Sequence, residues 1–117
     1  MRNRLKSAFE VLNSGNQSEI YILDEIHEWS ETNVRSFKEK LNAIPSGSNV
    51  KLYINSPGGQ IDIGLAVHNM IKPIASRVET HIIGMALSTA SWIGLSANRV
   101  VMRRNALMMI HNPTTWG

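Results

Sequence analysis

The chain has 117 residues, of which 43% are hydrophobic, and it carries a formal net charge of +3 at pH 7. This length and composition predict a single globular domain across residues 1–117 and exclude a disordered segment. The 12 Lys and Arg residues are scattered apart from Arg2, Arg4 and Lys6, so the charge does not indicate a nucleic-acid-binding protein.

The residue types also exclude several other classes of protein. There is no cysteine, so a disulfide framework, a thiolate metal site and a cysteine nucleophile are all excluded. No apolar run approaches the ~18 residues of a membrane span, and nothing resembles a signal peptide, so we expect a soluble cytoplasmic protein. No His, Asp and Glu grouping has metal-ligand spacing, and Gly58 and Gly59 lack the lysine of a phosphate loop. We therefore expect neither a metal nor a cofactor.

The predicted elements alternate between strands and helices. In chain order they are a strand at 20–23, a helix across Val34, Phe37 and Leu41, a strand at 50–54, a helix at 63–71, a strand at 77–83, a short helix at 88–97, and strands at 99–102 and 106–110. Ser30 or Thr32 is the expected cap of the first helix, and Pro73 is expected to end the second. This alternation is typical of right-handed β-α-β crossovers, so the sequence predicts an α/β fold with a mainly parallel sheet.

Three segments contain the residue types that a serine peptidase needs. They are the Asn-Ser-Pro-Gly-Gly turn at 55–59, Ser88 at the start of a predicted helix, and His111 after the last predicted strand. A serine hydroxyl is a weak nucleophile until a base takes its proton and hydrogen-bond donors stabilise the oxyanion. The backbone N–H of Thr89 would be unpaired at the helix start, and the glycine turn would supply a second N–H with no Cβ in the way.

Taken singly, each of these segments also has a structural interpretation. A serine at the start of a helix is commonly a cap or a packing residue, and a Ser-Pro-Gly-Gly run is commonly only a turn. We interpret Ser91, one turn after Ser88, as a packing or hydrogen-bonding residue. The remaining histidines, which are His27, His68 and His81, are interpreted as structural residues.

Together the three segments resemble the Clp protease proteolytic subunit family, in order and at about the family's spacing, over residues 21–112. The resemblance implies a ClpP/crotonase-like β-β-α spiral and a serine endopeptidase that acts on proteins or peptides. By this match Ser88 is the nucleophile and His111 the base, while Gly59 and Thr89 supply the oxyanion-hole amides. The family assembles as homo-oligomeric rings, so the resemblance also implies a ring.

Two further features are similar to the phage and prophage branch, the Clp-related head maturation proteases. These are the Ile-His-Asn-Pro sequence at 110–113 and Trp29 ahead of the first helix. The likeness implies cleavage of capsid or scaffold proteins in the cytoplasm of a bacterial host. Whether an ATPase partner is used stays open.

The sequence departs from the family pattern in two places. Leu87 stands beside the nucleophile where the family commonly has alanine. The family's aspartate follows a long helix on the C-terminal side of the histidine, whereas the aspartates here are Asp24 and Asp62, both upstream. The expectation is a C-terminally truncated domain that lacks the projecting helix and has little or no peptidase activity, because a triad without its aspartate loses about 10⁴ in turnover.

Two alternatives stay open. A crotonase-like acyl-CoA enzyme would share the spiral fold and an oxyanion hole made of backbone amides, without needing Ser88 or His111. A catalytically inactive prophage remnant or assembly protein would keep the fold without the chemistry.

Overall fold

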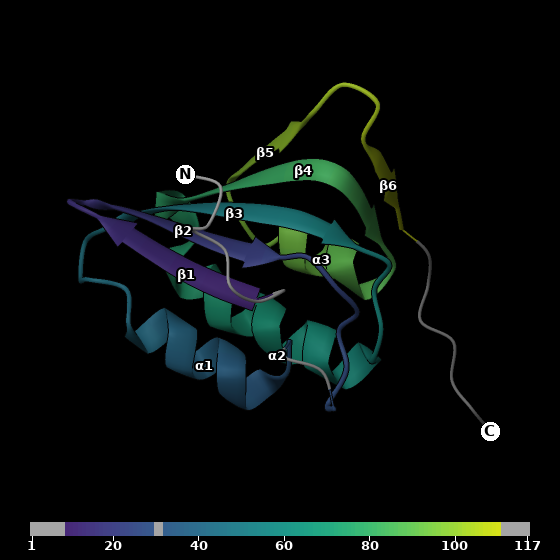
Figure 1. Ribbon diagram of the computed structural model, residues 1–117, viewed down its shortest axis with the longest axis horizontal. Helices are drawn as coiled ribbons and strands as arrows, with labels where there is room; N and C mark the ends of the chain where they lie inside the picture. Colours follow the sequence, from purple (N-terminus) through teal and green to yellow (C-terminus); the bar gives the residue numbers. More distant parts are fainter. Residues whose placement is uncertain (1–8, 30–31, 111–117) are drawn as a thin grey trace.

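The computed structural model describes residues 9–29 and 32–110, which form a six-stranded sheet with helices packed on one face (Figure 1). The elements are β1 (Phe9–Ser14), β2 (Gln17–Ile22), α1 (Val34–Asn42), β3 (Asn49–Ser56), α2 (Ile61–Ile71), the 3-10 helix η1 (Lys72–Arg77), β4 (Val78–Leu87), α3 (Thr89–Gly94), β5 (Arg99–Met102) and β6 (Leu107–Met109). The strand order is β1-β2-β3-β4-β5, and β6 also pairs with β4. Every pairing is parallel except that of β1 with β2. The predicted α/β fold with a mainly parallel sheet is confirmed.

The N-terminal hairpin was not predicted. β1 and β2 are antiparallel strands joined by a two-residue turn in which Gly15 has φ 62°. β2 begins at Gln17 rather than at Ile20, because its outward-facing residues are polar and only its end is an apolar run. A strand with one solvated face alternates in this way, so an apolar run detects only part of it.

The buried core lies between the sheet and the helices. Alternate residues of the central strands, including Ile22, Ile54 and Ile82, are fully buried on the helix side. Phe37 of α1, Val67 of α2 and Ile93 of α3 complete this core. On the other face of the sheet, the rings of Tyr21 and Tyr53 stack with their centroids 4.7 Å apart, and the centroids of the Tyr53 and His81 rings are 5.1 Å apart. Among the described residues, no helix is long and apolar enough to cross a membrane.

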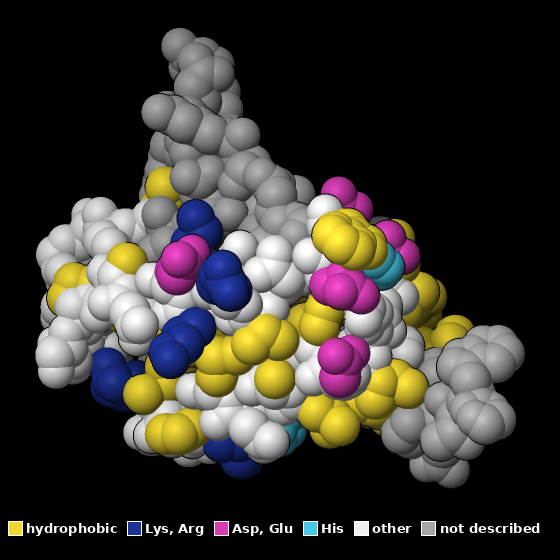
Figure 2. Space-filling model, turned by 90° about the horizontal axis from the view of Figure 1, so that it is seen from below, with side chains coloured by type: hydrophobic (Ala, Val, Ile, Leu, Met, Phe, Trp, Pro, Cys, Tyr) yellow, Lys and Arg dark blue, Asp and Glu magenta, His cyan; other side chains and the backbone are white. Residues whose placement is uncertain are grey.

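The outer side of the helix layer contains an apolar groove. It runs between α1, α2 and η1, and its apolar lining includes Leu41, Met70 and Ile74. Figure 2 shows hydrophobic side chains gathered across this side of the molecule. Lys38 and Arg77 are the charged residues of the groove, so its charged lining is cationic.

The cap of α1 is Asn33, which corrects the prediction of Ser30 or Thr32. The Asn33 side chain accepts a hydrogen bond from the Ser36 N–H at 2.9 Å. Thr32 is fully buried one residue earlier, in an isolated bridge with Ile26, and Ser30 lies outside the described residues. At the end of α2 the expectation about Pro73 is met, since the helix stops at Ile71 and the chain continues as η1.

Asn33→Ala is expected to lower the free energy of unfolding by about 1 kcal/mol, because the Ser36 N–H at the helix start loses its acceptor. Asn33→Asp keeps a capping oxygen and is expected to stay within about 0.5 kcal/mol of the parent. Urea denaturation followed by circular dichroism measures both variants. Equal stability of the two variants would show that this cap contributes nothing.

Candidate active site

Ser88 occupies a strained junction between β4 and α3. Its backbone has φ 55° and ψ −122°, a conformation that costs a residue other than glycine about 1–3 kcal/mol. The Ser88 N–H donates to the Met109 carbonyl at 2.8 Å, and the Ser88 carbonyl accepts from the Ser91 N–H at 2.9 Å and from Ser91 Oγ at 2.5 Å. The backbone is thus held on both sides, and Ser91 has the hydrogen-bonding role that was predicted for it.

The glycine loop between β3 and α2 lies against Ser88 at Gly58. Gly58 has φ 96°, and a Cβ placed there would lie 2.5 Å from the Leu87 carbonyl oxygen and 3.2 Å from Ser88 Cβ. The Gly58 N–H donates to Ser56 Oγ at 3.1 Å, within the loop itself. Only glycine therefore allows the loop to lie this close to Ser88.

Gly59 packs on the opposite side of the loop, against Ile26. A Cβ at Gly59 would lie 1.8 Å from the Ile26 carbonyl oxygen. The Ile26 N–H donates to the Gly58 carbonyl at 2.9 Å, and the Gln60 N–H donates to the Ile26 carbonyl at 2.8 Å. Because the peptide bond is planar and trans, the Gly59 N–H points opposite to the Gly58 carbonyl and so away from Ile26. No carbonyl of the described residues accepts from the Gly59 N–H.

Thr89 begins α3 directly after Ser88. Its N–H is one of the donors at a helix start that lack a carbonyl partner in the preceding turn. Its side chain is fully buried against α2, where a Cβ on Gly64 would lie 2.7 Å from Thr89 Cβ. Thr89 Oγ1 has no hydrogen-bond partner among the described residues.

The predicted base, His111, lies outside the described residues, so its side chain is not placed. The strand that leads to it does reach the site, because Met109 accepts the hydrogen bond from Ser88.

The two aspartates are exposed and make local contacts. Asp24 accepts from the Glu25 N–H at 2.7 Å, and Asp62 accepts from Gln60 Nε2 at 3.4 Å.

The predictions assigned no role to Asn55 or Gly84, which touch each other at the site. Asn55 Oδ1 accepts a hydrogen bond from the Met85 N–H at 3.0 Å. A Cβ at Gly84 would lie 2.3 Å from the same Oδ1. The available signal was the place of Asn55 next to the Ser-Pro-Gly-Gly turn and of Gly84 shortly ahead of Ser88.

Comparison with known proteins settles the family. The sequence model of the Clp protease family matches residues 3–116, which is nearly the whole chain. The chain belongs to the Clp protease family.

Two solved Clp protease structures are similar to this Clp family chain. A ClpP1 mutant from Listeria monocytogenes is 32% identical, with a TM-score of 0.65, over 78% of this chain and 54% of that one. The ClpP protease catalytic domain from Plasmodium falciparum is 30% identical, with a TM-score of 0.56, over 80% of this chain and 53% of that one. The chain spans about half the length of these Clp proteases.

The predicted ClpP/crotonase-like architecture is also supported by a more distant structure. A protein assigned as an enoyl-CoA hydratase from Rhodopseudomonas palustris has a TM-score of 0.65 at 13% identity, over 87% of this chain and 48% of that one. At this identity the likeness concerns the fold alone. It gives no support to acyl-CoA chemistry in this Clp family chain.

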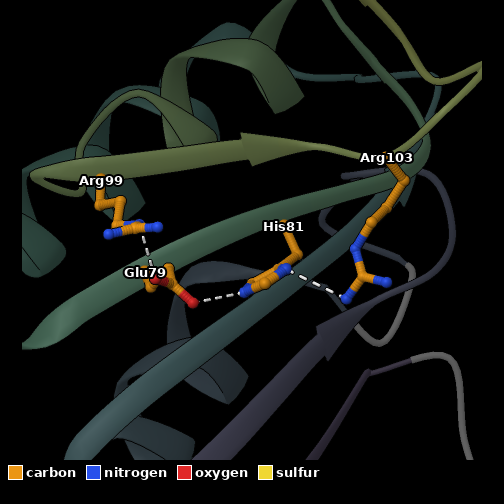
Figure 3. Close-up of polar contacts among 4 residues, drawn as sticks. All are labelled: Glu79, His81, Arg99 and Arg103. Carbon is orange, nitrogen blue, oxygen red and sulfur yellow. Dashed lines mark hydrogen bonds and ion pairs between the residues drawn. The ribbon is translucent and has the colours of Figure 1, made fainter.

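A second polar cluster of the Clp family chain lies on the open face of the sheet, away from the helices (Figure 3). His81 Nε2 lies 2.6 Å from a Glu79 carboxylate oxygen, and Arg103 Nη2 lies 3.1 Å from His81 Nδ1. Arginine can only donate, so Nδ1 is the acceptor and Nε2 carries the hydrogen that is donated to Glu79. Arg99 completes the cluster with an ion pair to Glu79 at 2.8 Å.

These contacts agree with the structural interpretation of the histidines. His68 Nδ1 lies 2.8 Å from the Trp92 carbonyl, and His27 Nδ1 accepts from the Trp29 N–H at 3.0 Å. Over 9–29 and 32–110, no group of three or more His, Asp and Glu residues is arranged to hold a metal ion.

Glu79→Gln is expected to flatten the dependence of stability on pH. The hydrogen bond from His81 lowers the pKa of Glu79 below its ordinary value of 4.5, and the charge of Arg99 adds to this. The unfolded chain therefore binds this proton more readily, so the stabilisation is present above pH 4.5 and is lost as the pH falls through the lower, folded-state pKa. Urea unfolding at pH 7, 5 and 3.5 should show that the difference in free energy of unfolding between the parent and Glu79→Gln becomes smaller as the pH falls. A difference that is constant with pH would contradict this.

Proposed function

We propose that this Clp family chain forms the nucleophile half of a serine endopeptidase site, with Ser88 as the nucleophile. One observation carries the proposal: a serine in a strained strand-to-helix turn lies against Gly58, whose missing Cβ allows the loop to approach it this closely. The same kind of strained turn exposes the nucleophile in other hydrolase folds. A packing serine would have no need of φ 55°, whereas strain of this kind is concentrated at functional sites.

In the proposed reaction, Ser88 Oγ attacks the carbonyl carbon of a peptide bond while His111 takes its proton. The C–N bond then breaks, the leaving amine receives that proton, and water hydrolyses the acyl-enzyme ester through the same base. His111 lies two positions after Met109, so their Cα atoms are at most about 7 Å apart. Since Met109 is hydrogen-bonded to Ser88, this short interval supports His111 as the proposed base.

The amides of Gly59 and Thr89 are the proposed oxyanion-hole donors. The Gly59 N–H points away from Ile26, and the Thr89 N–H lies at the start of α3. The Gly58 N–H is already donated to Ser56 Oγ, which favours Gly59 over Gly58 as the donor of this loop. The loss of one such donor typically costs about 10² to 10³ in rate.

The finer biological role is proposed from the resemblance. The Ile-His-Asn-Pro sequence at 110–113 and Trp29 favour head maturation, so capsid or scaffold proteins in a bacterial host cytoplasm are the proposed substrates of the whole protein, in a homo-oligomeric ring. Residues 1–117 alone are expected to turn over slowly or not at all, since Asp24 and Asp62 are exposed and hydrogen-bonded locally.

A fluorophosphonate probe tests the proposal, because it reacts only with an activated serine hydroxyl. Residues 1–117 are incubated with excess probe, and the modified peptide is identified by mass spectrometry. We expect a slow adduct on Ser88 that His111→Gln slows further, and Ser91→Ala is expected to leave the adduct in place. Adducts spread over several serines, or none at all, would overturn the assignment and favour an inactive remnant. Turnover of an acyl-CoA thioester that survives Ser88→Ala would favour the crotonase-like alternative.

A further inference from the structure

We infer that Asn55 is a positioning residue: its side-chain carbonyl holds a bulge in β4 and thereby sets Ser88 against the glycine loop. The inference rests on the proposed function, in which Ser88 is the nucleophile. It concerns a residue that need not touch the substrate or the reacting atoms.

The bulge appears in the pairing of β3 with β4. The register is regular from Val50 opposite Val78 to Ile54 opposite Ile82, and then shifts so that Ser56 lies opposite Ala86. β4 therefore uses four residues where β3 uses two. Extra residues of this kind bend a strand and leave a backbone group without its ladder partner. The shift falls just before Ser88, at the ends of the strands that carry the two halves of the site (Figure 1).

The Asn55 side chain supplies the acceptor at the bulge. Asn55 Oδ1 accepts a hydrogen bond from the Met85 N–H at 3.0 Å. A side chain of β3 therefore replaces the backbone carbonyl that would accept this hydrogen bond in a regular ladder. The bulge fits this side chain closely, because a Cβ on Gly84 would lie 2.3 Å from Oδ1. Only glycine at position 84 leaves room for the Asn55 amide.

The position of Asn55 links both halves of the site. The next residue, Ser56, is fully buried, and its hydroxyl accepts the N–H of Gly58, the glycine beside the nucleophile. On the other strand, Met85 and Leu87 pair with β6, and Met109, the last residue of β6, accepts the hydrogen bond from the Ser88 N–H. A change of register at the bulge would move Ser88 relative to Gly58. A displacement of 1 Å at a reacting group can cost about 10²-fold in rate.

Three substitutions at Asn55 distinguish the contribution of its side-chain carbonyl oxygen from those of its side-chain volume and its N–H donor. Asn55→Asp keeps an oxygen acceptor in the same place, Asn55→Leu keeps the volume without the acceptor, and Asn55→Ala removes both. Fluorophosphonate labelling of Ser88 is expected to slow about 10- to 100-fold in the Leu and Ala variants. We expect Asn55→Asp to stay within about threefold of the parent, since it can still accept the hydrogen bond. Asn69→Ala, at an exposed position of α2, is the matched control and should not change labelling.

Gly84→Ala tests the same contact from the other strand. Its new Cβ displaces the Asn55 amide, so it should slow labelling as much as Asn55→Ala does. If the two residues act through one contact, the double variant should be no slower than either single variant.

Amide hydrogen exchange gives a readout that does not depend on catalysis. In Asn55→Ala the Met85 amide should exchange faster, while the amides of Thr80 and Ile82 in the regular part of β4 stay protected. An equal loss of protection along β4 would show a global structural role and overturn the inference. So would unchanged labelling and unchanged Met85 exchange. If the parent itself is not labelled at Ser88, the proposed function fails, and the exchange of Met85 still decides whether Asn55 holds the bulge.

Discussion

Ser88→Gly is expected to abolish fluorophosphonate labelling and to make the protein more stable than the parent. The backbone at Ser88 has φ 55° and ψ −122°, a conformation that costs serine about 1–3 kcal/mol and that glycine adopts freely. The extra backbone entropy of glycine in the unfolded chain offsets about 0.5–1 kcal/mol of this gain. The expected net increase in the free energy of unfolding is about 1 kcal/mol.

Ser88→Ala is the matched control, because it removes the same hydroxyl and keeps the strained backbone. Its labelling should also be lost, while its free energy of unfolding should stay within about 0.5 kcal/mol of the parent. Urea denaturation of the three proteins measures the difference. A Ser88→Gly variant that is less stable than Ser88→Ala would show that the strain at this residue is not a cost to the fold.

Gly58→Ala is expected to slow labelling of Ser88 about 10²- to 10³-fold, comparable to the loss of an oxyanion-hole donor. The new Cβ would lie 2.5 Å from the Leu87 carbonyl oxygen, and since the backbone fixes the positions of both atoms, neither can rotate away. The loop must withdraw from Ser88, which would displace the adjacent Gly59 amide, the proposed oxyanion-hole donor. Overpacking and the unfavourable φ of 96° together should cost about 2–4 kcal/mol of stability.

Gly47→Ala is the control for the backbone conformation alone. Gly47 has φ 79°, and a Cβ there would meet nothing within 4 Å. Its cost should be about 1 kcal/mol, with labelling of Ser88 unchanged. If Gly58→Ala were labelled as fast as Gly47→Ala, close approach of the loop to Ser88 would not matter to the site.

The sequence predicted the central part of the fold because its signals are local and periodic. The apolar residues of α2 recur at helical spacing, and the apolar run of β3 ends at the Ser-Pro-Gly-Gly turn. β1 was not predicted, since it lies at the edge of the sheet and pairs only with β2. β4 extends to Leu87, four residues beyond its predicted end, because Gly84 resembles a strand breaker but accommodates the Asn55 side chain within a bulge.

The candidate site was predicted as a set of segments rather than as a geometry. Residue types identified Ser88 and the glycine turn as candidates, but they could not show which glycine lies against Ser88. That depends on Ile26, which lies more than 30 residues earlier in the chain and holds the loop from the other side. The contact between Asn55 and Met85 likewise joins residues 30 positions apart, so no local pattern could reveal it. His111 stays a prediction, since it lies outside the described residues.

The hydrogen bond from the Ser88 N–H to the Met109 carbonyl has a consequence for how this protein can vary in length. Upstream of β6, the exposed turn at Arg104 and Asn105 joins two strands that each pair with β4 independently, so insertions there should leave the site intact. Downstream, the interval between Met109 and His111 limits how far the proposed base can lie from Ser88. One residue added or removed there is expected to change the labelling of Ser88 without changing the stability of the sheet, which separates loss of activity from loss of folding.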